Sequence, residues 1–97
     1  MGFKITGGRG FHITFENGYT VSVQFGPGNY CEHYDGDMML FVEGPVPRTW
    51  ESADAEVAVW GSDHEMIEMP GWNNTVNGRQ SPKDVLELLN WAAGQKP

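Results

Sequence analysis

Apolar and polar residues alternate along two neighbouring segments near the start of the chain. The alternation runs from Phe11 to Phe15 and again from Tyr19 to Phe25, on either side of Asn17-Gly18. Period-two alternation is typical of a β-strand with one buried face, and Asn-Gly is typical of the central positions of a type I′ hairpin turn. The sequence therefore predicts a β-hairpin with Asn17-Gly18 as its two-residue turn.

Further strands are expected on both sides of this hairpin. Phe3 and Ile5 predict a short strand before it, and the alternation at residues 55–60 predicts a strand after it. The turn residues at positions 61–63 are suited to reversing the chain into residues 64–69, which gives a second hairpin that Pro70-Gly71 ends.

The segment from Gly26 to Asp54 shows no sustained period. It contains a Gly-Pro-Gly-Asn turn at residues 26–29 and two more prolines at positions 45 and 47. Glycine and proline in such numbers favour turns. We expect a long loop with one short strand at residues 38–42.

The C-terminal segment has the signals of a helix. Ser81 is a good N-cap, Pro82 suits the first helical position, and Asp84 is placed to complete a capping box. Gly94 is a natural stop. The apolar stripe that this helix carries is formed by Val85, Leu88, Leu89 and Ala92.

Together these elements predict an α+β fold, with a small antiparallel sheet of two hairpins, about four to five strands, packed against one C-terminal helix. The helix is expected to cover the apolar face of the first hairpin, formed by Phe11, Ile13, Phe15, Val21 and Val23. A chain of 97 residues without repeats predicts a single domain over residues 1–97.

Charge and composition exclude several classes of function. The formal net charge is −7, and ten of the thirteen carboxylates lie in residues 32–68, with Arg48 as the single base there. Direct nucleic-acid binding needs clustered Lys and Arg, which this chain lacks. No apolar run has the length of a membrane span, and no signal-peptide pattern precedes the strands. A lone cysteine needs no oxidising compartment, so we expect a cytoplasmic protein without membrane association.

The densest group of potential ligands is formed by Cys31, His33, Asp35 and Asp37. Structural zinc sites use pairs of ligands from two separate places, whereas one short loop would have to surround the ion here. A nucleophilic cysteine needs a base nearby, and the acidic neighbours of Cys31 disfavour its thiolate. We therefore predict no catalytic residues, metal or cofactor. A small enzyme or metal-binding protein centred on Cys31 and His33 remains the alternative.

The favoured hypothesis is a nonenzymatic protein-interaction module. An acidic surface attracts basic partners, although its simpler role is to keep a small domain in solution. Tryptophan and tyrosine are preferred anchors of protein interfaces. A third hypothesis is a homodimer formed by pairing of strand edges. The candidate interaction residues are Tyr30, Cys31, His33, Tyr34, Asp35, Asp37, Trp50, Trp60 and Trp72.

Three segments carry a resemblance to other sequences: GFHITFENGYTVSVQFGPGNYC at residues 10–31, SADAEVAVW at 52–60 and SPKDVLELLNW at 81–91. In these the chain resembles a group of short hypothetical proteins found in phage and marine metagenome sequences. The acidic middle of the chain lies outside the resemblance. The resemblance implies an accessory protein of a phage or mobile element and supplies no catalytic residues.

Overall fold

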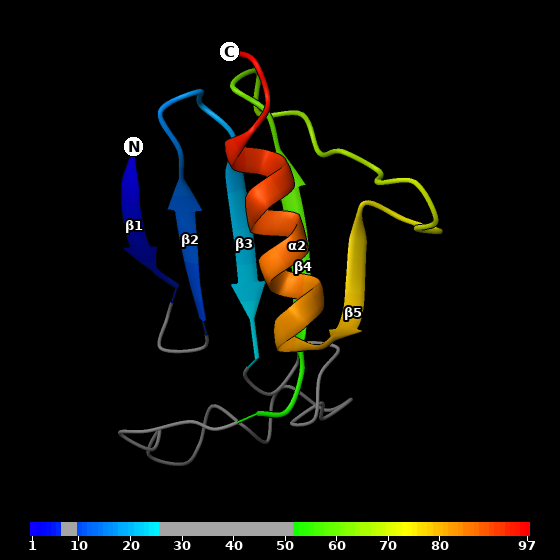
Figure 1. The fold of residues 1–97 in the computed structure, drawn as a ribbon. Coiled ribbons are helices and arrows are strands. Elements are labelled where there is room, and N and C mark those ends of the chain that lie inside the picture. Colours follow the sequence, from blue (N-terminus) through cyan, green and yellow to red (C-terminus); the bar gives the residue numbers. More distant parts are fainter. Residues whose placement is uncertain (7–9, 26–51) are drawn as a thin grey trace.

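The computed structural model describes residues 1–6, 10–25 and 52–97. They form a five-stranded antiparallel sheet, in the order in which its strands follow along the chain, with helix α2 packed on one face (Figure 1). This confirms the predicted α+β fold with a C-terminal helix. The elements are β1 (Gly2–Ile5), β2 (Gly10–Thr14), β3 (Thr20–Gln24), β4 (Ala55–Trp60), β5 (Val76–Gln80) and α2 (Pro82–Ala93).

The loop between β2 and β3 differs from the predicted type I′ turn. The Gly18 N–H donates to the Phe15 carbonyl at 2.9 Å and the Phe15 N–H donates to the Tyr19 carbonyl at 2.9 Å. The loop therefore contains three residues, and Gly18 has a positive φ of 88° whereas Asn17 does not. A type I′ turn needs positive φ at both central residues, so that prediction was wrong.

The physical reason is the register of the strands. Residues directly opposite each other on paired strands point to the same face of the sheet. Ile13 lies opposite Val21, and Phe11 lies opposite Val23. A two-residue turn would shift this register by one and place Ile13 opposite Ser22 instead, which would separate the apolar residues of the two strands. Burial of the apolar face therefore outweighs the local preference of Asn-Gly.

The strand that pairs with β4 also comes later than predicted. Residues 64–69 contribute a single bridge, between Trp60 and Met66, and the continuous partner of β4 is β5. The register between β4 and β5 shifts near Ala55 and Val57. β5 was missed because its sequence, VNGRQ, has polar residues and a glycine where strand propensity favours β-branched and aromatic ones.

Helix α2 begins as the sequence predicts. The Ser81 side chain accepts a hydrogen bond from the Asp84 N–H at 3.2 Å, and the Asp84 carboxylate accepts from the Ser81 N–H at 2.9 Å, which completes the capping box. The helix is capped at its C-terminal end by Gly94. It is 12 residues long, and within the described ranges no helix is long and apolar enough to cross a membrane.

The position of α2 on the sheet differs from the prediction. The helix lies over β3, β4 and β5 rather than over β2 (Figure 1). The residues that lie beneath it are the most buried: Val21, Val23, Ala55, Val57 and Val59 of the strands, with Leu88 and Ala92 of the helix. Phe11, Ile13 and Phe15 pack against the edge of this core and are half-buried. The apolar face of β2 is therefore covered only in part.

Asn17 joins the β2–β3 loop to the end of α2. Its side-chain amide donates hydrogen bonds to the carbonyls of Ala92, at 2.7 Å, and Gln95, at 2.8 Å. Its side-chain oxygen accepts from the Tyr19 N–H at 3.0 Å. The last carbonyls of a helix have no partner within the helix, and Asn17 supplies donors to this end while it also shapes its own loop.

We expect Asn17→Ala to lower the free energy of unfolding by about 2–3 kcal/mol, because three hydrogen bonds of about 1 kcal/mol each are lost. Asn17→Asp keeps the acceptor for Tyr19 but places a negative charge against the negative end of the helix dipole, so it should destabilise at neutral pH as well. Urea denaturation measures both. Asn74→Asp is the matched control, because the Asn74 side chain bonds only within its own turn. Equal losses in Asn74→Asp and Asn17→Asp would contradict this role of Asn17.

Candidate functional site

Most of the predicted interaction residues lie outside the described ranges. They are Tyr30, Cys31, His33, Tyr34, Asp35, Asp37 and Trp50, and the predicted strand at residues 38–42 lies there too. The acidic interaction segment and the alternative site at Cys31 and His33 therefore stay predictions. Within the described ranges, no three His, Cys, Asp or Glu side chains come together as metal ligands.

Trp60 and Trp72 are described, and they lie on opposite faces of the sheet. Trp60 alternates with Val59 along β4, so it points away from α2, and its ring meets that of His12 edge to face at 5.0 Å between centroids. Trp72 packs against the core and, together with Trp91 of the helix, lines a hollow of about 370 Å³. The two tryptophans are each half-buried and do not form a common surface.

His12 has a lowered pKa in the folded chain. Partial burial lowers its pKa below the usual 6.5, and the Lys4 ammonium on the paired strand lowers the pKa further. Lys4 lies directly opposite His12. The neutral imidazole, packed against the Trp60 ring, is therefore the form that the fold favours at neutral pH.

This shift makes a pH prediction. Because the pKa of His12 is lower in the folded chain, the unfolded chain binds more protons as the pH falls. The contribution of neutral His12 to the free energy of unfolding is therefore complete above about pH 6.5, and it is lost as the pH falls through the pKa of His12 in the folded chain. Urea denaturation between about pH 7.5 and pH 5 should show a larger loss for wild type than for His12→Gln. Lys4→Gln should lie between the two. A wild-type profile that runs parallel to that of His12→Gln would contradict the assignment.

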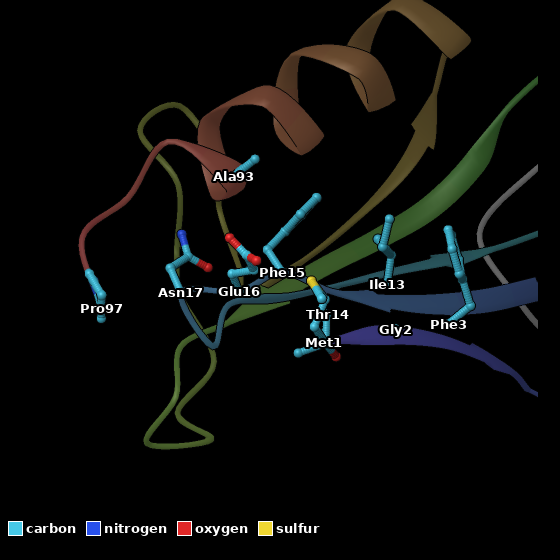
Figure 2. A pocket seen from close by; sticks show the side chains of 10 residues that line it. All are labelled: Met1, Gly2, Phe3, Ile13, Thr14, Phe15, Glu16, Asn17, Ala93 and Pro97. Carbon is cyan, nitrogen blue, oxygen red and sulfur yellow. The ribbon is translucent and has the colours of Figure 1, made fainter.

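A hollow lies between the β1–β2 hairpin and the C-terminal end of α2. It has a volume of about 650 Å³. Figure 2 shows Phe3, Ile13 and Phe15 rising from their strands on the side of the sheet that carries the helix. Ala93 of the helix forms the opposite wall, and Glu16 and Asn17 stand at one end.

A second hollow, of about 280 Å³, continues along the same boundary toward the start of the helix. It lies between Phe11 of β2 and the helical residues Leu86 and Leu89. Leu86, Leu89 and Ala93 are spaced i, i+3 and i+7, so they lie along one side of α2. We call the two hollows together the β2–α2 groove, which is lined by Phe3, Phe11, Ile13, Phe15, Leu86, Leu89 and Ala93.

Two large apolar side chains of this groove, those of Phe3 and Leu86, are exposed. Phe3 is 81 % exposed, Ile5 beside it is 78 % exposed, and Leu86 is 56 % exposed. Phe3 and Ile5 lie opposite Ile13 and Phe11, so all four side chains share the face that carries α2. Exposed apolar surfaces are common at sites where proteins bind other molecules.

The charged side chains at the groove are acidic. Glu16 lines the hollow at one end and Asp54 lines the hollow at the other. Among the described residues, no Lys, Arg or His lines either hollow. Lys4, the basic residue of β1, alternates with Phe3 and Ile5 and so belongs to the opposite face of the sheet.

The sequence contains a signal for this groove, which is the width of its apolar face rather than a chemical motif. A helix is about 10 Å wide, and neighbouring strands are about 4.8 Å apart, so one helix covers about two or three strands. Phe3, Ile5, Phe11 and Ile13 extend the apolar face beyond that width. On the helix, Leu86 is exposed and lies on the side of α2 that borders Phe11 of β2.

Comparison with known proteins finds no relative of this chain. No family model, no curated protein and no solved structure matches the chain. The interpretation of the β2–α2 groove therefore depends on its geometry and chemistry.

Proposed function

We propose that this chain is a nonenzymatic protein-interaction module, and that its β2–α2 groove binds an amphipathic helix with a basic polar side. The observation that carries the proposal is the exposed apolar floor and wall of the groove, formed by Phe3, Ile13, Leu86 and their neighbours. An amphipathic helix that lays its apolar side into a groove is a recurring mode of recognition.

The dimensions of the groove fit a helix. α2 has 12 residues and is therefore about 18 Å long, and the two hollows follow its side from Leu86 to Ala93. The floor consists of β1 and the partly covered β2, whose combined width of about 10 Å equals that of one helix. A partner helix would lie beside α2 and complete the layer that α2 begins.

The charges at the groove favour a basic partner. Glu16 and Asp54 lie at its two ends, and the net charge of the chain is −7. Opposite charges at the rim of an interface speed association and select partners. The acidic segment with Tyr34, Asp35 and Asp37 adds to the same preference in this proposal.

The biological setting belongs to the proposal as well. The resemblance to phage and metagenome sequences suggests an accessory protein that modulates a host or phage protein in the cytoplasm. What supports this is the sequence likeness together with an acidic chain that has a lone cysteine.

The test uses three labelled 18-residue peptides and fluorescence anisotropy. One peptide is an amphipathic Leu/Lys helix, the second has Glu in place of Lys, and the third has the composition of the first in a non-amphipathic order. We expect the Leu/Lys helix to bind at least about tenfold more tightly than the other two, because both burial and charge favour it.

Variants connect this binding to the groove. Leu86→Gln should weaken binding of the Leu/Lys helix about tenfold, the cost of one buried leucine contact. Met66→Gln is the matched control, because Met66 is an exposed apolar side chain that does not line the groove. No binding of the Leu/Lys helix, or equal binding by Leu86→Gln and wild type, would reject the proposed function.

A further inference from the structure

Strand β1 forms one edge of the sheet, and its outer side has no partner strand among the described residues. The Thr6 N–H donates to the Gly10 carbonyl at 3.0 Å. Because hydrogen-bonded positions alternate along an antiparallel pair, Lys4 and Gly2 also direct their backbone groups toward β2. Phe3 and Ile5 therefore direct their N–H and carbonyl groups outward, away from the sheet.

The two edges of the sheet differ in how they are protected. β5, the other edge, has a register shift against β4, a glycine at position 78 and a left-handed residue, Arg79, with φ of 55°. Bulges and irregular backbone of this kind prevent further strands from pairing. β1 pairs with β2 in an unbroken register and carries Phe3 and Ile5, which are 81 % and 78 % exposed. A regular apolar edge strand is a site of strand pairing.

We propose that β1 pairs antiparallel with β1 of a second copy of this chain, about a two-fold axis perpendicular to the sheet. An antiparallel pair of identical strands satisfies such an axis, and the interface is then closed. Pairing of β1 with the irregular β5 edge of another copy would instead continue into fibres, and the structure of β5 opposes it. In the dimer both sheets form one continuous sheet with the two α2 helices on the same face.

The charges and apolar residues of β1 select the register of this pair. Two registers place the helix-bearing faces of both sheets on the same side and put the two-fold axis near the middle of β1. In one of them Phe3 lies opposite its own copy, and in the other Lys4 does. The Lys4 register places two ammonium groups directly opposite each other, which is destabilising. The Phe3 register places Phe3 opposite its copy and Lys4 opposite Gly2. It also forms reciprocal hydrogen bonds between the outward groups of the two Phe3 residues.

The interface is small, and this sets the expected affinity. β1 has only four residues. Stable protein interfaces bury at least about 1,200 Å² of accessible surface, and two short strands with their phenylalanine side chains bury no more than this. We therefore expect a dimer that dissociates on dilution rather than a permanent one.

Sedimentation equilibrium of the full chain tests the association. As its concentration is raised, wild type should change from monomer to dimer before the concentration reaches about 1 mM. Phe3→Pro removes the outward N–H, which the monomer does not use, so the fold should persist and the association should weaken at least about tenfold. Phe3→Val keeps the N–H and should weaken it less. A wild type that stays monomeric, or equal weakening by both variants, would overturn strand pairing.

Cross-linking tests the register. In a Cys31→Ser background, Phe3→Cys should form a disulfide-linked dimer on mild oxidation, because opposite residues have Cα atoms about 5.5 Å apart, within disulfide range. Lys4→Cys should not, since its copy lies two positions away. Cross-linking through position 4 and not position 3 would overturn the Phe3 register. Leu86→Gln should leave the dimer intact, so loss of peptide binding and loss of pairing are distinguishable.

Discussion

The structure depends on the register of the β2–β3 hairpin. Ile13 opposite Val21 and Phe11 opposite Val23 place every large apolar side chain of the hairpin on one face. That register needs a loop of three residues, and the third residue, Gly18, takes a positive φ of 88°. A Cβ at Gly18 would lie 2.7 Å from the Ser62 Cβ, so glycine serves both the backbone angle and the close approach of the next loop.

The same loop determines where the helix ends. Asn17 stands at the middle of the three residues and bonds to the carbonyls of Ala92 and Gln95. The contact joins residues far apart in the chain and aligns α2 along β3, with Leu88 and Ala92 over the central valines. Because one helix is narrower than five strands, this placement covers β2 only in part and leaves the same face of β1 exposed among the described residues. The exposed groove follows from the way the core is closed.

Local chemistry made several elements predictable. The Ser81 capping box, Pro82 and Gly94 are signals within a few residues of the helix ends, and the alternation in β2, β3 and β4 is visible without tertiary information. The errors arose where long-range packing decides. β5 lacks strand propensity and is held by pairing with β4, and the lateral position of α2 depends on Asn17 and on the core valines. None of the predicted interaction residues that the structure describes lines the groove. The predicted residues are aromatic, acidic or metal-ligating side chains typical of interfaces and chemical sites, whereas the groove is formed by ordinary apolar residues that exceed what one helix can cover.

The face and the edge of β1 can be used at the same time, because a strand directs its side chains and its backbone groups at right angles. Phe3 presents its side chain to the groove, and the side chain of Ile5 lies on the same face of the sheet. Both residues direct their hydrogen-bonding groups to the edge. Pairing with a second copy supplies hydrogen-bond partners for the outward backbone groups of β1. It also widens the apolar floor of the groove without covering it. Two grooves related by the two-fold axis would then lie on one face, in opposite directions. A partner with two basic amphipathic helices would bind such a dimer with higher avidity than either groove gives alone, since the second contact forms at a high effective concentration. Weak pairing of β1 is then an advantage, because the partner itself would stabilise the dimer.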